Sequence, residues 1–321
     1  MTIIGTDDGL YRWDESTGSV EPIGLQGHRI RDVARCPDQS LIAVESGKRV
    51  WMGRPGDVPW VDLTRGLAEA PTTILVREGD GTVYVGTEPP AVYRLDRETR
   101  TWQVVEVLHE REEAEDWYAP GGPPAVRSMA AHPGNPRGLY LDIHVGGIMR
   151  TLDGGATWTS VNDGLELDVH QVITHPRRPE AIYTATADGF YCSPDEGVTW
   201  ERRNRGLEHL YTRGIAIHPD APDVILISGS PTSPGGWGRR GKRFALFRSE
   251  DSGHQWHRVT TGMPNECPEE IDTFCLAFSR TMPDEVLCGR RDGVLHLSRD
   301  AGATWETVTE ALPPIYAIWA G

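Results

Sequence analysis

Short runs of alternating apolar and polar residues, separated by turns that contain glycine or proline, make up most of this chain. Residues 169–176, 181–186 and 190–192 form one set of three such runs, and a further short run follows Trp200. Alternation with a period of two residues predicts β-strands, and the intervening glycines mark the turns between them. Each unit of the chain is therefore predicted to consist of four short antiparallel strands.

A turn of eight residues ends the third strand of each unit in the second half of the chain. It occupies residues 151–158, 193–200, 249–256 and 298–305, with Ser or Thr first, Asp third, Gly fifth and Trp eighth. The hydroxyl and carboxylate can bond to the backbone of the turn, Gly can adopt positive φ, and Trp supplies an apolar anchor. Because the same chemistry recurs four times, it indicates a structural repeat and argues against one active site.

Looser copies of the unit cover residues 1–108, and they keep the spacing of the tryptophans. Trp60 and Trp102 are 42 residues apart, as are Trp158 and Trp200. Seven four-stranded units predict an all-β fold, a seven-bladed β-propeller that forms a single domain over residues 1–321. The last run, 315–319, has no unit of its own. We expect it to join the N-terminal strands in one blade and to close the ring.

The composition of the chain argues against several classes of binding function. The chain has 47 acidic and 32 basic residues and a net charge of −15, which disfavours binding to nucleic acid or to a membrane surface. The start lacks the features of a signal peptide, so a cytoplasmic location is expected. The five cysteines show no CxxC spacing, which favours buried thiols over a zinc site. No cofactor is expected.

The motif S/T-x-D-x-G-x-T-W resembles the Asp-box, or BNR, repeat of the propellers found in sialidases, sortilins and photosystem stability and assembly factors. The likeness is strong in the last four units and weak in the first three. It implies the propeller fold. These families include hydrolases, receptors and assembly factors, so the motif alone does not decide between functions.

Two long insertions interrupt the repeat, and both are expected on the same face of the ring. Residues 109–124 are acidic at first and then rich in aromatic residues and glycine, and residues 229–243 end in a basic run. Long loops on a rigid scaffold often carry function. The two insertions are therefore candidate contacts for a protein partner. The basic run also resembles a phosphate-binding patch, but in an acidic chain it is more typical of a solvated loop or lid.

One residue of each innermost strand is predicted to face the central axis. Alignment of these strands on their shared ending selects Arg31, Thr73, Arg127, His170, Arg213, Asp272 and Tyr316. Three arginines around one axis favour a pocket for a small anionic ligand, carboxylated or phosphorylated. The alternative is a ring of Arg–Asp salt bridges that fills the channel.

A second set of residues follows the next strand and is expected just outside the first. Arg290 and His144 could bind the ligand, and Glu88 and His144 could act as general acid and base. His144 and His170, with Glu88 or Asp142, are the weak candidates for metal ligands. No spacing presets their geometry, so no metal is predicted.

The axial residues are also similar to those of sialidases. The resemblance implies that Arg31, Arg127 and Arg213 hold a carboxylate, Tyr316 is the nucleophile and Asp272 is the acid. Either Glu88 or Glu45 would have to supply the base that Tyr316 needs, and His170 is a further catalytic candidate. The chain has Arg29-Ile30-Arg31 where sialidases have Arg-Ile-Pro, and seven units replace six. The second hypothesis is a non-catalytic interaction or assembly propeller. Unpaired arginines in an open pocket would support the enzymatic hypothesis. Arg–Asp pairs that fill the channel would support the non-catalytic hypothesis.

Overall fold

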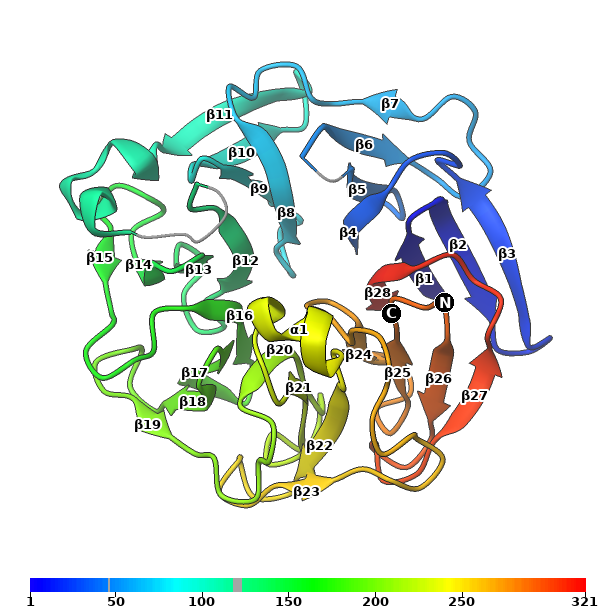
Figure 1. The fold of residues 1–321 in the computed structure, drawn as a ribbon. Helices are drawn as coiled ribbons and strands as arrows, with labels where there is room; N and C mark the ends of the chain where they lie inside the picture. The colour runs from blue at the N-terminus through cyan, green and yellow to red at the C-terminus, as the bar shows by residue number, and fades with distance from the viewer. Residues whose placement is uncertain (46, 118–122) are drawn as a thin grey trace.

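The protein forms a ring of seven four-stranded antiparallel sheets around a central channel, and the predicted seven-bladed propeller is confirmed (Figure 1). The structure is a computed structural model that describes residues 1–45, 47–117 and 123–321. We number the blades 1 to 7 in chain order. In each blade the first strand named below is the innermost.

The strands have the following bounds. Blade 1 contains β28 (Ile315–Ala320), β1 (Thr2–Thr6), β2 (Gly9–Asp14) and β3 (Ser19–Gly24). Blade 2 contains β4 (Ile30–Arg35), β5 (Leu41–Glu45), β6 (Arg49–Gly53) and β7 (Val61–Asp62). Blade 3 contains β8 (Ala70–Val76), β9 (Val83–Glu88), β10 (Val92–Asp96) and β11 (Thr101–Glu106). Blade 4 contains β12 (Val126–Ala131), β13 (Leu139–Ile143), β14 (Gly147–Thr151) and β15 (Thr159–Ser160).

The remaining blades repeat this order. Blade 5 contains β16 (Val169–His175), β17 (Arg178–Thr186), β18 (Gly189–Ser193) and β19 (Glu201–Arg202). Blade 6 contains β20 (Tyr211–Ile217), β21 (Ile225–Ser230), β22 (Ala245–Ser249) and β23 (His257–Arg258). Blade 7 contains β24 (Leu276–Phe278), β25 (Val286–Gly289), β26 (Leu295–Ser298) and β27 (Glu306–Thr309).

The two ends of the chain close the ring as predicted. Strand β28 pairs antiparallel with β1, from Thr2 opposite Ala320 to Thr6 opposite Ile315. The terminal amino group of Met1 donates a hydrogen bond of 2.9 Å to the carbonyl of Gly321, and the termini lie side by side in Figure 1. Blade 1 therefore takes its strands from both ends of the chain, which removes the exposed sheet edge of an open ring.

The four eight-residue turns form the hydrogen bonds that their residues predict. In the turn at 193–200, the Ser193 hydroxyl accepts the N–H of Gly197 at 2.7 Å and donates to Asp195 at 2.9 Å. Asp195 in turn accepts the N–H and hydroxyl of Thr199 at 2.8 and 2.7 Å. Gly197 has φ of +89°, and the Trp200 indole donates to the Val161 carbonyl of the preceding blade at 2.7 Å. The turn therefore ties one blade to its neighbour.

Apolar side chains pack between neighbouring sheets and form the core. Between blades 5 and 6, for example, Tyr183, Phe190, Phe247 and Trp256 are buried together. All five cysteines are buried and unpaired. The interior of each sheet sandwich is thus apolar, whereas the charged residues discussed below gather around the channel.

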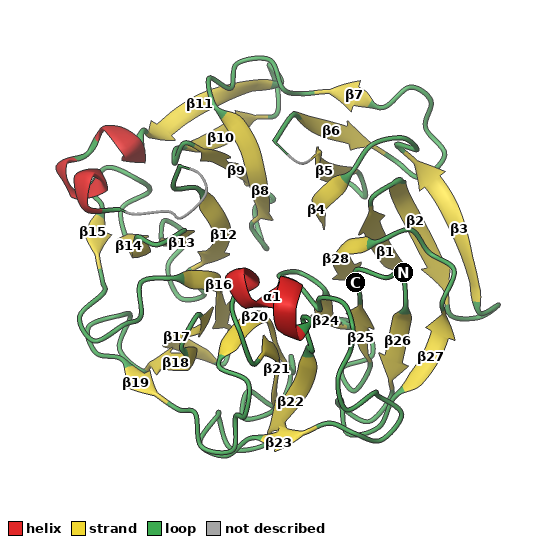
Figure 2. Ribbon diagram, viewed as in Figure 1, coloured by secondary structure: helices red, strands yellow, loops and turns green. Residues whose placement is uncertain are grey.

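The two insertions lie where the chain order predicted. The first connects β11 to β12 and contains the 3-10 helices η1 (Leu108–Glu110) and η2 (Glu112–Asp116); its residues 118–122 lie outside the described part of the chain. The second connects β21 to β22 and contains helix α1 (Pro234–Arg240), which lies in front of the centre of the ring (Figure 2). None of the described helices is long and apolar enough to span a bilayer.

Candidate functional site at the channel mouth

A β-bulge near the start of each innermost strand aims a side chain toward the axis. Register shifts of this kind occur in six of the seven blades. In a bulge two residues oppose one, so the extra side chain leaves the regular alternation. The residues at the bulges are Arg31, Thr72, Arg127, His170, Arg213 and Tyr316.

Two members of the predicted column fall outside this pattern. Thr73 lies one residue beyond the bulge, because β8 lacks the X-Pro ending used for alignment. Its hydroxyl donates instead to Asp32 of blade 2 at 2.8 Å. Asp272 precedes β24, yet its carboxylate still reaches the cluster. The bulges therefore explain the convergence of the other axial residues.

Asp272 is sandwiched between two arginines from blades 6 and 7. Arg213 Nε donates to Asp272 Oδ1 at 2.8 Å, and Arg291 pairs with the other carboxylate oxygen. Burial alone would raise the pKa of Asp272, but the two guanidinium groups hold it far below its usual range. Asp272 is therefore ionised at neutral pH and fully engaged.

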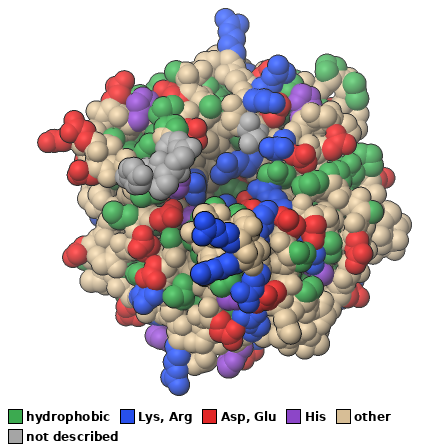
Figure 3. Space-filling view, in the orientation of Figure 1, with side chains coloured by type: hydrophobic (Ala, Val, Ile, Leu, Met, Phe, Trp, Pro, Cys, Tyr) green, Lys and Arg blue, Asp and Glu red, His purple; other side chains and the backbone are tan. Residues whose placement is uncertain are grey.

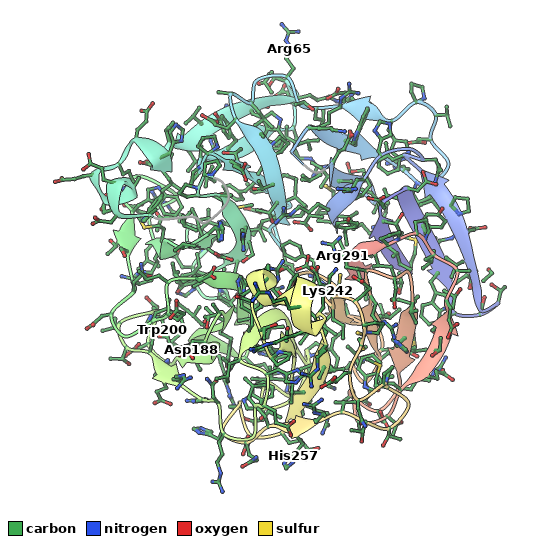
Figure 4. The ribbon with its side chains drawn as sticks, in the orientation of Figure 1. Arg65, Asp188, Trp200, Lys242, His257 and Arg291 are labelled. Atoms are coloured by element: carbon green, nitrogen blue, oxygen red, sulfur yellow. The ribbon has the colours of Figure 1, made fainter. Side chains whose placement is uncertain are left out.

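Tyr316 lies directly beneath one of these arginines. The Arg291 guanidinium carbon is 3.1 Å from the centroid of the Tyr316 ring, and Figure 4 shows Arg291 close to Lys242 near the centre of the ring. The contact is a cation–π stack. No hydrogen bond joins the Tyr316 hydroxyl to a carboxylate among the described residues, so no base is in place to activate it.

Arg31 and Arg127 differ from Arg213 because neither forms an ion pair or side-chain hydrogen bond within the described residues. Burial, reinforced by the nearby charge of Arg213, lowers the pKa of Arg127 to about 10. Burial also lowers the pKa of Arg31, although Asp272 partly offsets this effect. Both groups remain protonated at neutral pH. The channel mouth therefore holds two guanidinium groups that form no ion pair within the described residues, although the charge of Asp272 acts on Arg31 and that of Asp168 on Arg127.

A second polar cluster, formed by His144, Asp168 and His170, flanks Arg127. Asp168 Oδ1 lies 3.4 Å from His170 Nε2 and 3.8 Å from His144 Nε2. His170 Nδ1 lies within hydrogen-bond distance of the Thr212 carbonyl, and its Nε2 faces Asp168. Burial and the charge of Arg127 lower the pKa of His144 to about 4, and burial lowers that of His170. Both rings are therefore neutral at neutral pH.

Two carboxyl groups near Arg127 have pKa values that are shifted in opposite directions. Burial raises the pKa of Asp142 well above its ordinary value, and its side chain is completely buried. Burial would also raise the pKa of Asp168, but His170 and Arg127 lower it. Asp142 accepts one hydrogen bond of 3.1 Å from Ser128.

The remaining predicted site residues are not joined to this cluster. Glu88 is exposed at the end of β9, and within the described chain no hydrogen bond or ion pair links it to an axial residue. Arg290 pairs with Asp292 and contacts His296 at 3.3 Å within blade 7. No set of three or more His, Cys, Asp or Glu side chains suited to a metal ion occurs among the described residues.

Sequence reasoning missed Arg291 and Asp168. Both lie in loops rather than in the aligned strands, next to residues that were selected. Their roles follow from contacts between blades: Arg291 with Asp272, and Asp168 with His170. No local pattern marks them.

The insertion with α1 borders the same opening. Lys242 pairs with Glu269 and, at 3.1 Å, with Glu270, and its amino group lies 5.6 Å from the Trp237 ring centroid. Trp237 also donates to the Thr232 carbonyl at 2.7 Å. Figure 3 shows basic side chains around a central depression on this face. The insertion is thus packed onto the rim and leaves basic groups around the opening.

Comparison with known proteins agrees with this architecture. The family model described as "Sortilin, neurotensin receptor 3" matches residues 146–269. Vacuolar protein sorting/targeting protein 10 of Pyricularia oryzae is 33% identical over 30% of this chain and 7% of its own length. An oligoxyloglucan-reducing end-specific xyloglucanase of Emericella nidulans is 24% identical over 57% of this chain and 24% of its own length. The chain therefore spans only a minor part of these relatives.

Two kinds of solved structure share the fold. YCF48 bound to D1 peptide superposes with a TM-score of 0.58 and 17% identity, covering 87% of this chain and 82% of that one. An ancestral GH74 enzyme gives a TM-score of 0.63 at 18% identity, covering 84% of this chain and 36% of that one. The predicted resemblance is thus confirmed: the chain is a seven-bladed propeller, its residues 146–269 resemble the sortilin family model, and its fold is shared by YCF48 and GH74 propellers.

Proposed function

We propose that this propeller is a binding protein that captures a carboxylate-bearing peptide segment of a partner at the channel mouth. Arg31 and Arg127 are the observation that carries the proposal, since both are charged and neither has an ion-pair partner among the described residues. Guanidinium groups bind carboxylates through charge-assisted hydrogen bonds. A carboxylate at the axis would compensate both charges at once.

A protein that binds its ligand without catalysing a reaction fits the surroundings of the two carboxyl groups near the axis, Asp272 and Asp142. Asp272 is held between Arg213 and Arg291 and cannot supply a proton near neutral pH. Burial raises the pKa of Asp142, but its side chain is completely buried and out of reach of a ligand. A glycosidase needs an acid and a nucleophile or base on either side of the scissile bond. The described residues at the axis provide no such pair.

A peptide ligand is favoured over a free small anion by the whole-length likeness to YCF48. In the solved structure YCF48 is bound to D1 peptide, and the match covers more than four fifths of both chains. Here the insertion at 229–243, with helix α1 in front of the centre of the ring, borders the same mouth and would contact residues beside the captured carboxylate. The GH74 match covers about a third of the enzyme chain, which supports the fold but not its activity.

The experiment is a calorimetric titration with acidic hexapeptides, each in a free-acid and a C-terminally amidated form. Arg31→Gln and Arg127→Gln should each weaken binding at least about tenfold, the worth of one charge-assisted hydrogen bond. Arg65→Gln is the matched control, because Arg65 projects outward from the rim of the ring in Figure 4. It removes the same charge and should bind like the wild type.

Three results would count against the proposal. Equal affinity of the wild type and both variants would remove the arginines from the binding site. Turnover of a chromogenic sugar-acid glycoside by the wild type, lost in Tyr316→Phe, would replace the proposal with the enzymatic hypothesis. Tight binding of galacturonate with no preference for any peptide would identify a small anion as the ligand.

A further inference from the structure

The opposite face of the propeller contains a separate hollow that is lined by both apolar and charged side chains. It lies where the innermost strands end, at the turns that lead into the second strands, and thus at the other end of the strands from the bulges. One lobe has a volume of about 660 Å³ and is lined by Met129, Val172 and Ile173 of blades 4 and 5. Another, of about 440 Å³, is lined by Ala34 and Trp319 of blades 2 and 1. Both volumes fall in the range of small-molecule sites.

A single ion pair separates the two lobes. Leu75, Val76, Arg77, Glu78 and Arg280 line both of them. Glu78 follows β8 of blade 3 and pairs with Arg280, which follows β24 of blade 7. Blades 3 and 7 are not neighbours in the ring (Figure 1). The pair therefore crosses the channel opening, and because both side chains are more than half exposed, it can open at little cost.

Arg77 is the buried polar group at the junction of the lobes. It is only 8% exposed, and its guanidinium lies over the Tyr84 ring at 5.5 Å. Its Nη2 makes a long hydrogen bond of 3.4 Å to the Gly138 carbonyl, and its Nε has no partner among the described residues. Asp80 accepts the N–H of Thr82 at 2.8 Å, and the charge of Arg77 contributes to its lowered pKa, but no hydrogen bond joins Asp80 to Arg77 among the described residues. A buried donor without a partner is costly, and an anion would satisfy it.

We infer that this hollow is a second binding site, which takes an amphipathic anion with an elongated apolar body and one acidic group. The acidic group binds Arg77, and the apolar body lies against Met129, Val172 and Ile173 in the larger lobe. When the Glu78–Arg280 ion pair opens, a ligand with a longer apolar chain can extend into the smaller lobe beside Trp319. This site shares no residue with the channel mouth, and the inference does not depend on the function proposed there.

The test is a fluorescence titration of the full chain with 11-(dansylamino)undecanoic acid, a probe with an apolar chain and a carboxylate. Arg77→Met keeps the apolar stem over Tyr84 but removes the charge. It should weaken binding at least about tenfold, while the methyl ester of the probe should bind wild type and variant alike. Ala131→Trp, which places a bulky ring at the edge of the larger lobe, should abolish binding of both probes.

Control variants distinguish a loss of binding at this hollow from an effect at the channel mouth and from misfolding of the variant. Arg65→Met removes an outward-facing arginine (Figure 4), and Arg127→Gln alters only the mouth; both should retain wild-type affinity. Arg280→Ala, at an exposed position, should leave thermal stability unchanged and raise the affinity for a longer-chain probe. The inference is overturned if the wild type shows no saturable binding, or if Arg77→Met and Ala131→Trp both fold and bind the probe as the wild type does.

Discussion

Arg213 and Asp272 form an ion pair across the boundary between blades 6 and 7, with Arg213 Nε 2.8 Å from Asp272 Oδ1. The pair is buried, and Arg291 holds the second oxygen of the same carboxylate. The single carboxylate of Asp272 thus forms ion pairs with two guanidinium groups. This arrangement compensates one of these two positive charges and leaves Arg31 and Arg127 without an ion-pair partner among the described residues.

Asp272→Asn should strongly destabilise the protein. Removal of one partner from a buried pair leaves uncompensated charge, at a cost of about 3–5 kcal/mol in the free energy of unfolding. Denaturation in urea measures the difference. Asp220→Asn is the control, since it breaks the exposed Arg177–Asp220 pair and should cost less than about 1 kcal/mol. Similar values for the two variants would contradict a structural role for the buried pair.

Tyr316 provides a test that separates stacking from nucleophilic chemistry. Tyr316→Phe keeps the ring beneath Arg291, so peptide affinity at the mouth should stay within about twofold of the wild type, well inside the ~1.4 kcal/mol that corresponds to tenfold. Tyr316→Ala removes the stack and should weaken binding. Calorimetry compares the two variants with the wild type. A loss of affinity in Tyr316→Phe would show that the hydroxyl, and not the ring face, contacts the ligand.

His144 and His170 should remain neutral well below the pH at which an exposed histidine titrates. Burial is the main cause, and it lowers the pKa of His144 to about 4 from an unfolded value near 6.5. Between these values the unfolded chain binds a proton that the native state does not, so stability falls as pH decreases from about 6.5 to 4. NMR of imidazole nitrogens would follow the titration. His144→Gln should reduce this loss of stability.

The carboxylate of the first repeat turn should stabilise the protein only above acidic pH. Hydrogen bonds from the hydroxyl and N–H of Thr157 lower the pKa of Asp153 below its ordinary value. A lowered folded pKa means that the contribution is present above about pH 4, the unfolded value, and is lost as pH falls through the folded pKa. Asp153→Asn should therefore be less stable than the wild type at pH 7 and converge with it at low pH. Thermal melting across pH tests this, with exposed Asp163→Asn as the control.

Ring closure should depend on the last strand. Removal of residues 315–321 deletes β28 and leaves β1 as an unpaired edge next to a buried face. The truncated chain should lose cooperative unfolding and self-associate, because open strand edges template further pairing. Circular dichroism and light scattering would report both effects. A monomeric, cooperatively melting product would show that blade 1 tolerates three strands.

The amino-acid sequence by itself determined the seven blades, the turns and the closure, because these depend on local patterns. Strand alternation has a period of two, and the bonds of Ser193 and Asp195 lie within five residues. The arginines at the mouth were also predictable, since Arg31, Arg127 and Arg213 share a position before the X-Pro ending, and that position carries the bulge.

Only the tertiary structure decided which of these charges are neutralised. Arg213 meets Asp272 across 59 residues of sequence, whereas Arg127 meets no carboxylate among the described residues. Asp142 and Asp168 are the same residue type, yet the pKa of Asp142 is raised and that of Asp168 is lowered, because burial and neighbouring charges differ. Such differences arise from desolvation and from contacts between blades, and no periodicity within one blade encodes them.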